Sequence, residues 1–243
     1  MPFALSDDEA LMRDTVRQFA RGWGLDKAAE ADRFDRYPEQ AMAEAATLGL
    51  TALSAKDGPG ATAAVLALDE VAQVDPTLAA CLAAHNAALA AASSANHPVA
   101  AQLATGEIGA LLVAEEASGS DALHPGTVAK GEPPALTGQK VWAINATAAK
   151  HLLVLARHGK GLSLVAVPAG AKGIKIGAND PIMGLRSAGI RTVYLSNVAF
   201  TADALVGKSG EGAAAVAAGR TWLTLGSAAA LCGAVAGALE AAA

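Results

Sequence analysis

Apolar residues recur every three or four positions through the first hundred residues, which is the spacing of one face of an α-helix. The pattern begins at a Ser6-x-x-Glu9 capping box, in which each side chain can satisfy the backbone N–H of the other residue. Pro38, Gly49 and the pair Asp75-Pro76 then punctuate the chain. The pattern predicts helices over residues 7–21, 39–48, 61–74, 77–93 and 98–104.

From residue 108 onward the period changes. Short runs of β-branched and other strand-forming residues alternate with turns such as Gly-Lys-Gly and Pro-Ala-Gly. Seven such runs within about ninety residues are typical of a compact antiparallel barrel or sandwich. The predicted strands are 111–113, 126–130, 136–144, 152–156, 162–167, 174–176 and 191–198.

After residues 207–212 the pattern returns to a single helix that reaches residue 243. We therefore predict an α+β protein with three parts: a helical domain over 1–106, a β domain over 107–210, and the start of a second helical domain over 211–243. The last helix has no helical partner left in the sequence, so we expect its apolar face to mediate a homo- or hetero-oligomer. The segment 110–145 crosses the seam between the first two domains, where flat cofactors and acyl ligands tend to bind.

Composition supports a globular protein and excludes several partners. Of the 243 residues, 53% are apolar, which is enough to bury a core, and the formal net charge is -5 with no basic run. Such a surface does not attract nucleic acid or an anionic membrane. Residues 221–239 carry no charge and could span a membrane by length, but they are mostly Ala and Gly, which favours a helix buried in a bundle. We expect a protein without a membrane partner.

The cysteines and histidines indicate neither disulfides nor metal. Cys81 and Cys232 lie far apart in apolar helical sequence, so we expect two buried thiols in a reducing, cytoplasmic location, and the N-terminus has no secretory signal pattern. His85 lies in an apolar helical stripe without a second ligand at metal-binding spacing. It is therefore predicted to be a hydrogen-bonded core histidine.

Several local strings resemble hallmarks of one family. Residues 114–121 read Ala-Glu-Glu-Ala-Ser-Gly-Ser-Asp, and residues 137–145 read Thr-Gly-Gln-Lys-Val-Trp-Ala-Ile-Asn. Together with 183–187 (Met-Gly-Leu-Arg-Ser), 198–200 (Val-Ala-Phe) and 48–50 (Leu-Gly-Leu), they resemble the acyl-CoA dehydrogenase family across nearly the whole chain. The order of helical domain, β domain and helix is also similar to that family.

The resemblance implies a flavoprotein oxidoreductase of fatty acid metabolism that binds FAD and an acyl-CoA thioester. Glycine- and serine-rich backbone can hold ring oxygens and phosphates, and a Trp supplies a flat apolar wall. Without the family pattern, a plain turn at 117–120 and a core Trp would be the simpler interpretation. The family pattern places FAD contacts at Leu111, Val113, Ala114, Glu115, Gly119, Ser120, Trp142, Ala143 and Ile144, and acyl-CoA contacts at Ser120 and Arg220.

The chain also departs from the family pattern. Two flavin-contacting threonines of the family are Ala114 and Ile144 here, and Glu116 replaces a proline beside a site for an anionic cofactor. The family reaction removes a C2 proton with a carboxylate, but the position before Arg220, which carries this base in some members, is Gly219. No catalytic residue can therefore be named, because the usual glutamate lies late in a helical domain of which only the first helix is present.

Three hypotheses follow from this combination. The first is an acyl-CoA dehydrogenase-like flavoprotein that performs α,β-dehydrogenation of an acyl-CoA, with a partner chain supplying the base. The second is a non-catalytic relative that acts as a binding or structural subunit. The third is a truncated gene product without a role of its own.

Overall fold

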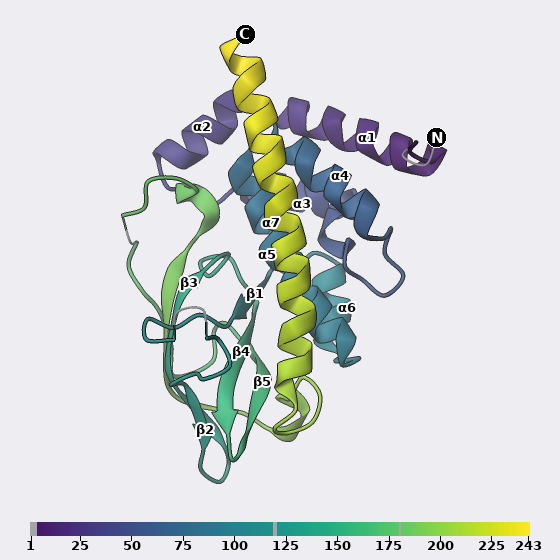
Figure 1. The fold of residues 1–243 in the computed structure, drawn as a ribbon. Helices are drawn as coiled ribbons and strands as arrows, with labels where there is room; N and C mark the ends of the chain where they lie inside the picture. The colour runs from purple at the N-terminus through teal and green to yellow at the C-terminus, as the bar shows by residue number, and fades with distance from the viewer. Residues whose placement is uncertain (1–3, 119–120, 180) are drawn as a thin grey trace.

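The computed structural model describes residues 4–118, 121–179 and 181–243, and it confirms the α+β architecture (Figure 1). Helices form the first part of the chain, strands form the middle, and one long helix follows. The helices are α1 (Asp7–Trp23), α2 (Leu25–Arg33), α3 (Glu39–Thr47), α4 (Ala61–Ala72), α5 (Pro76–Ser94), α6 (Val99–Ala104) and α7 (Gly212–Ala242). The strands are β1 (Gly109–Leu112), β2 (Val128–Lys130), β3 (Ala135–Ala143), β4 (His151–His158), β5 (Gly161–Pro168), β6 (Ile174–Ile176) and β7 (Arg191–Ala199).

Side-chain caps that are visible in the sequence begin two of the helices, α1 and α5. The capping box at α1 forms as predicted, with the Glu9 N–H donating to Ser6 Oγ at 3.3 Å and the Ser6 N–H donating to Glu9 Oε2 at 2.8 Å. At α5, the Asp75 carboxylate caps the first turn by accepting from the N–H groups of Thr77 and Leu78, both at 2.9 Å. Helix α2 was not predicted, because its only large apolar residue is Leu25 and no helical stripe is visible.

The sheet is mixed, which corrects the prediction of a wholly antiparallel barrel or sandwich. Strand β7 pairs antiparallel with β3 on one side and with β6 on the other, and β5 pairs antiparallel with β4 along its whole length. The opposite edge of β4 is shared by β1 at its start and β2 at its end, both parallel. Local periodicity predicts where strands lie but not which strands pair, so this long-range pairing was not visible in the sequence.

Helix α7 crosses the whole molecule and joins its parts. In Figure 1 it runs from the β domain past α5 and α4, and its end projects beyond α2. Its backbone approaches its neighbours closely at glycines: a Cβ at Gly226 would lie 2.7 Å from Ala83 Cβ, and one at Gly233 would nearly overlap the Asp69 carbonyl oxygen. At these glycines the backbone of α7 packs directly on α4 and α5, and small buried side chains such as Ala229 and Ala230 fill the contact face between them.

The opposite face of α7 is uncovered. Leu231, Val235 and Leu239, each four residues apart, are 68%, 60% and 68% exposed. Among the described residues, α7 alone is long and apolar enough to cross a membrane. Its most apolar 18-residue stretch has a mean hydropathy of 1.6, and only 22% of that stretch is buried. The prediction of a helix buried in a bundle is thus met on one face only. The prediction of two buried thiols is confirmed for Cys81 and wrong for Cys232, which is exposed.

The seam between the helices and the sheet is hydrogen-bonded through buried side chains. His85 Nδ1 accepts from the Gly109 N–H at 3.1 Å, which leaves the proton on Nε2 to donate to the Thr51 carbonyl oxygen at 3.0 Å. Asn145 donates to the Cys81 carbonyl oxygen at 2.9 Å. The prediction of a hydrogen-bonded core histidine is confirmed, and these bonds fix α5 against the first strand of the sheet.

We expect His85 to make the fold sensitive to mild acid. Burial lowers the pKa of His85 from 6.5 to about 4, because the neutral ring is the form that fits the core. The folded state therefore takes up this proton less readily than the unfolded chain. The free energy of unfolding keeps its full His85 contribution above pH 6.5 and loses it as the pH decreases towards 4. Urea unfolding should show a loss of roughly 2 kcal/mol between about pH 7 and pH 5 that is absent in His85→Gln. Identical pH slopes for the two proteins would contradict this assignment.

Candidate functional site

A cavity of about 240 Å³ opens between the β domain and α7. Its walls come from β1 and the residues after it, from the end of β3, and from α7. Apart from Arg220, all the lining side chains are apolar. The lining residues are Leu111, Val113, Ala114, Ala122, Val141, Trp142, Arg220 and Leu223.

Trp142 is presented to this cavity by an irregularity in β3. The register between β3 and β7 shifts between Lys140 and Ala143, and Trp142 has a φ of 56°. A bulge of this kind turns one side chain out of the regular alternation, and a positive φ is strained for a bulky residue. The ring is 64% exposed, which is unusual for the largest apolar side chain. Strain that holds an aromatic ring at a cavity wall points to a binding role.

A buried ion pair fixes the backbone on which the cavity depends. Lys140 is fully buried in β3, and its Nζ donates to Glu115 Oε1 at 2.7 Å and to the Val113 carbonyl oxygen at 3.2 Å. The Glu115 carboxylate also accepts from the N–H groups of Gly126 at 2.6 Å and Thr127 at 3.0 Å. The ion pair therefore ties the segment after β1 to β3 and to the residues that lead into β2.

The charges of this pair are coupled. Burial opposes ionisation of Glu115, but the hydrogen bonds from Lys140 and Thr127 outweigh it, so the pKa of Glu115 lies below its ordinary value. Burial lowers the pKa of Lys140, and Glu115 offsets part of that effect. The carboxylate of Glu115 is thus ionised and fully engaged, and it is not available as a base in the cavity.

The structure brings together only part of the site predicted from the family pattern. Leu111, Val113, Ala114, Trp142 and Arg220 line the one cavity. Ile144 lines a smaller neighbouring cavity of about 50 Å³ that shares Leu111, Trp142 and Leu223 with the first.

Three further positions singled out in the sequence lie outside the cavity lining, and two more fall outside the described residues. Ala143 faces the core of the sheet at 3% exposure, and Glu115 does not line the cavity. Glu116, which the sequence suggested would lie beside the cofactor, is exposed and also outside the lining. The predicted contacts at Gly119 and Ser120 fall outside the described residues.

Three lining residues, Ala122, Val141 and Leu223, were not identified from the sequence. Leu223 lies one helical turn beyond Gly219 on α7, and this spacing from a candidate site residue is the one signal that could have found it. Ala122 and Val141 are small apolar residues with no distinguishing pattern.

Position 219 cannot hold a side chain. A Cβ on Gly219 would lie 2.7 Å from both the Ala87 carbonyl oxygen on α5 and Leu111 Cδ2 on β1, so this position has no room for a carboxylate. Among the described residues, no carboxylate lines either cavity. The arrangement can therefore bind a flat apolar ring with an anionic group near Arg220, but it contains no group that can remove a proton from carbon.

Two family models match most of the chain. The model for the N-terminal domain of acyl-CoA dehydrogenases matches residues 6–105, and the model for the middle domain matches residues 110–198. Curated relatives include the short-chain specific acyl-CoA dehydrogenase of Clostridium acetobutylicum, which is 28% identical over 232 residues. That alignment covers 87% of this chain but 61% of the relative, so the chain spans about three fifths of its length.

Solved structures show the same fold. A glutaryl-coenzyme A dehydrogenase in complex with glutaryl-CoA matches with a TM-score of 0.90 and 25% identity, covering 100% of this chain and 67% of that one. A glutaryl-CoA dehydrogenase of Mycobacterium smegmatis in complex with FADH2 matches with a TM-score of 0.89 and 22% identity, covering 97% of this chain and 64% of that one.

Proposed function

This chain belongs to the acyl-CoA dehydrogenase family, and we propose that it binds FAD against Trp142 and takes part in the α,β-dehydrogenation of an acyl-CoA thioester. The observation that carries the proposal is the strained, exposed Trp142 at the wall of an apolar cavity that also holds Arg220. The FADH2 complex of a neighbour and the glutaryl-CoA complex of another support the choice of ligands. The non-catalytic alternative is not favoured by these relatives.

The residues present fit a flavin ring. Trp142 offers a flat face, while Leu111, Val113 and Leu223 supply apolar walls that exclude water. The segment at Ala114 lies against β3 through a hydrogen bond from the Val141 N–H to the Ala114 carbonyl oxygen at 3.0 Å, so its backbone is held in place. When bound, FAD would supply the hydride acceptor of the reaction.

The residues of the chain itself would bind and orient the reactants. The Arg220 guanidinium lies at the mouth of the cavity and can attract the anionic part of either ligand. Leu223 and Trp142 separate this mouth from the smaller cavity bounded by Ala84 and Ala87. We propose that the proton at C2 is removed by a carboxylate from outside these 243 residues, because no described side chain in the cavity can do so.

Titration with FAD tests the proposal directly. The purified chain should quench flavin fluorescence to a stoichiometric end point and become yellow after gel filtration. Failure to retain any FAD would refute the flavin assignment. If FAD binds but no acyl-CoA reduces an electron acceptor, even after addition of a helical partner chain, the binding-subunit alternative would replace the catalytic one.

We expect Ala114→Thr to strengthen FAD binding. Ala114 lines the cavity, and a threonine there would add a hydroxyl where the family places a flavin-contacting one. One further hydrogen bond contributes roughly 0.5–1.5 kcal/mol, which is about a 2- to 12-fold gain in affinity. Ala114→Val has nearly the same shape without the hydroxyl and serves as the control. Equal affinities of the two variants would show that no hydrogen bond forms at this position.

We also propose that the uncovered face of α7 binds a helical segment of another polypeptide. Leu231, Val235 and Leu239 form a stripe at helical spacing that is suited to helix-on-helix packing. The variant Leu231→Lys/Val235→Lys should shift the chain from an oligomer to a monomer in light scattering, with little change in monomer stability because both side chains are exposed. A wild-type chain that is monomeric and floats with lipid vesicles would show that the stripe contacts membrane instead.

A further inference from the structure

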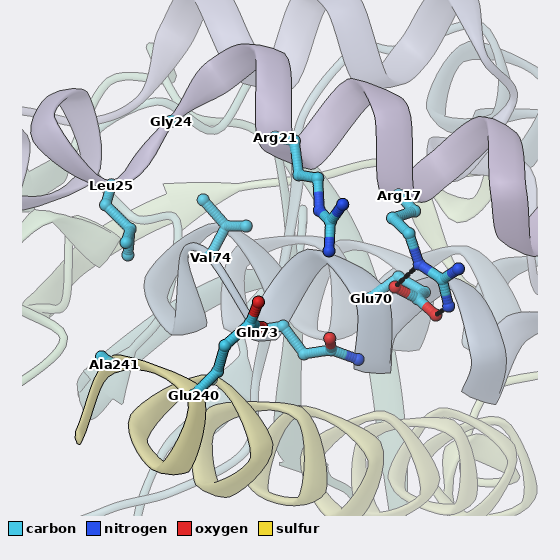
Figure 2. Close-up of a pocket in the computed structure, with 10 residues that line it drawn as sticks. Arg17, Arg21, Gly24, Leu25, Glu70, Gln73, Val74, Glu240 and Ala241 are labelled. Atoms are coloured by element: carbon cyan, nitrogen blue, oxygen red, sulfur yellow. Dashed lines mark hydrogen bonds and ion pairs between the residues drawn. The ribbon is translucent and has the colours of Figure 1, made fainter. Parts of the chain in front are cut away.

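Another cavity, of about 380 Å³, lies at the far end of α7, where this helix meets α1, α2 and α4 (Figure 2). Glu240 in its wall is about twenty residues along α7 from Arg220, or roughly 30 Å at the rise of an α-helix. The cavity is therefore separate from the flavin cavity, and nothing in the proposed function uses it.

One side of this cavity is closed by a completed ion pair. Arg17 on α1 donates to Glu70 on α4 through Nη2 at 2.6 Å and through Nε at 3.0 Å. The Glu70 side chain is only 5% exposed, so this two-point contact is a fixed part of the wall. The charges of Arg17 and Glu70 cancel each other and leave no net attraction for a ligand.

Two further charges face the cavity without a partner. In Figure 2, Arg21 extends from α1 into the space and Glu240 rises towards it from α7, and the only dashed contacts join Arg17 and Glu70. Within the described part of the chain, the side chains of Arg21 and Glu240 make no hydrogen bond or ion pair, and both residues are exposed at the edge of the cavity. The Gln73 amide nitrogen donates to Asp69 at 2.9 Å, which leaves its carbonyl oxygen free to accept.

The balance of these charges selects the ligand class. An anion would be attracted by Arg21 but repelled by the Glu240 carboxylate. A cation would be attracted by Glu240 but repelled by Arg21. A zwitterion satisfies both groups, while Leu25 and Val74 supply apolar surface in the same cavity. We propose that this cavity binds an α-amino acid with a short aliphatic side chain, its carboxylate on Arg21 and its ammonium on Glu240.

Calorimetric titration with L-leucine tests the site. We expect saturable binding, with 4-methylpentanoate (no ammonium) and 3-methylbutylamine (no carboxylate) at least about tenfold weaker, because each loses one charged contact. Arg21→Gln and Glu240→Gln should each weaken leucine binding by a similar factor. Arg13→Gln removes a half-buried arginine that pairs with Asp14 on the same helix, outside the cavity, and should leave binding unchanged.

Three results would overturn the proposal. The first is no leucine binding at millimolar concentration, and the second is equal binding of leucine and 4-methylpentanoate. The third is a double-mutant cycle in the absence of ligand that shows Arg21 and Glu240 stabilising the fold together, since they would then pair with each other. FAD titration of the same variants should be unaffected, so failure here is distinguishable from failure of the flavin proposal.

Discussion

Replacing Trp142 by glycine is expected to lower the affinity for FAD about 5- to 150-fold while leaving the fold intact. Stacking of a flat ring on an aromatic side chain contributes roughly 1–3 kcal/mol, and this contribution is lost with the indole. The fold should tolerate the change because Trp142 is 64% exposed and glycine adopts its φ of 56° without strain. Flavin fluorescence titration measures the affinity, and thermal unfolding measures the stability.

Two matched variants make this result interpretable. Trp142→Phe keeps a flat ring and should lose much less affinity than Trp142→Gly. Tyr194→Ala removes another exposed aromatic side chain, on β7 and outside the cavity lining, and should not alter FAD binding. If Trp142→Gly binds FAD as tightly as the wild type, Trp142 does not contact the ring.

Replacing Lys140 by methionine should destabilise the fold by about 3–5 kcal/mol, the usual cost of removing one partner of a buried ion pair. Methionine fills the space of the lysine stem but leaves the Glu115 carboxylate with only its two backbone donors. The loss should be largest at neutral pH. It should decrease in acid, because protonation of Glu115 removes the unpaired charge. Urea unfolding at several pH values measures both effects.

The double variant Lys140→Met/Glu115→Gln provides the control for this prediction. It removes both charges, and the neutral amide can keep an acceptor for the Gly126 and Thr127 N–H groups. Its stability should lie well above that of Lys140→Met alone. A loss below about 1 kcal/mol for Lys140→Met would show that the buried pair contributes specificity and not stability.

Most of the fold could be predicted from the sequence because its signals are local. The Ser6-x-x-Glu9 box, the Asp75-Pro76 pair and the return to helix after Gly212 all fix element ends through neighbouring residues. The parallel pairing of β1 with β4 could not be predicted in this way, since it joins strands separated by β2 and β3. Helix α2 was missed because its burial depends on tertiary contacts and not on a periodic stripe.

The sequence motifs predicted which residues lie near the candidate site, but not how their side chains are oriented. The string around Trp142 located the aromatic wall, but its positive φ and outward direction depend on a bulge that no periodicity shows. The family motif over residues 114–121 predicts a cofactor contact at Glu115. Its partner Lys140 lies twenty-five residues away, so the buried pair that removes it from the cavity could be found only in three dimensions.

The glycine contacts of α7 have a consequence for the order of folding. Four glycines inside this helix, at positions 219, 226, 233 and 237, each cost roughly 1 kcal/mol of intrinsic helicity relative to alanine, or about 4 kcal/mol together. The isolated segment should therefore be less helical than its many alanines suggest. We expect the helix to be completed when its glycine-containing face docks on α4 and α5, so α7 would form late, on a template that the rest of the chain has already built.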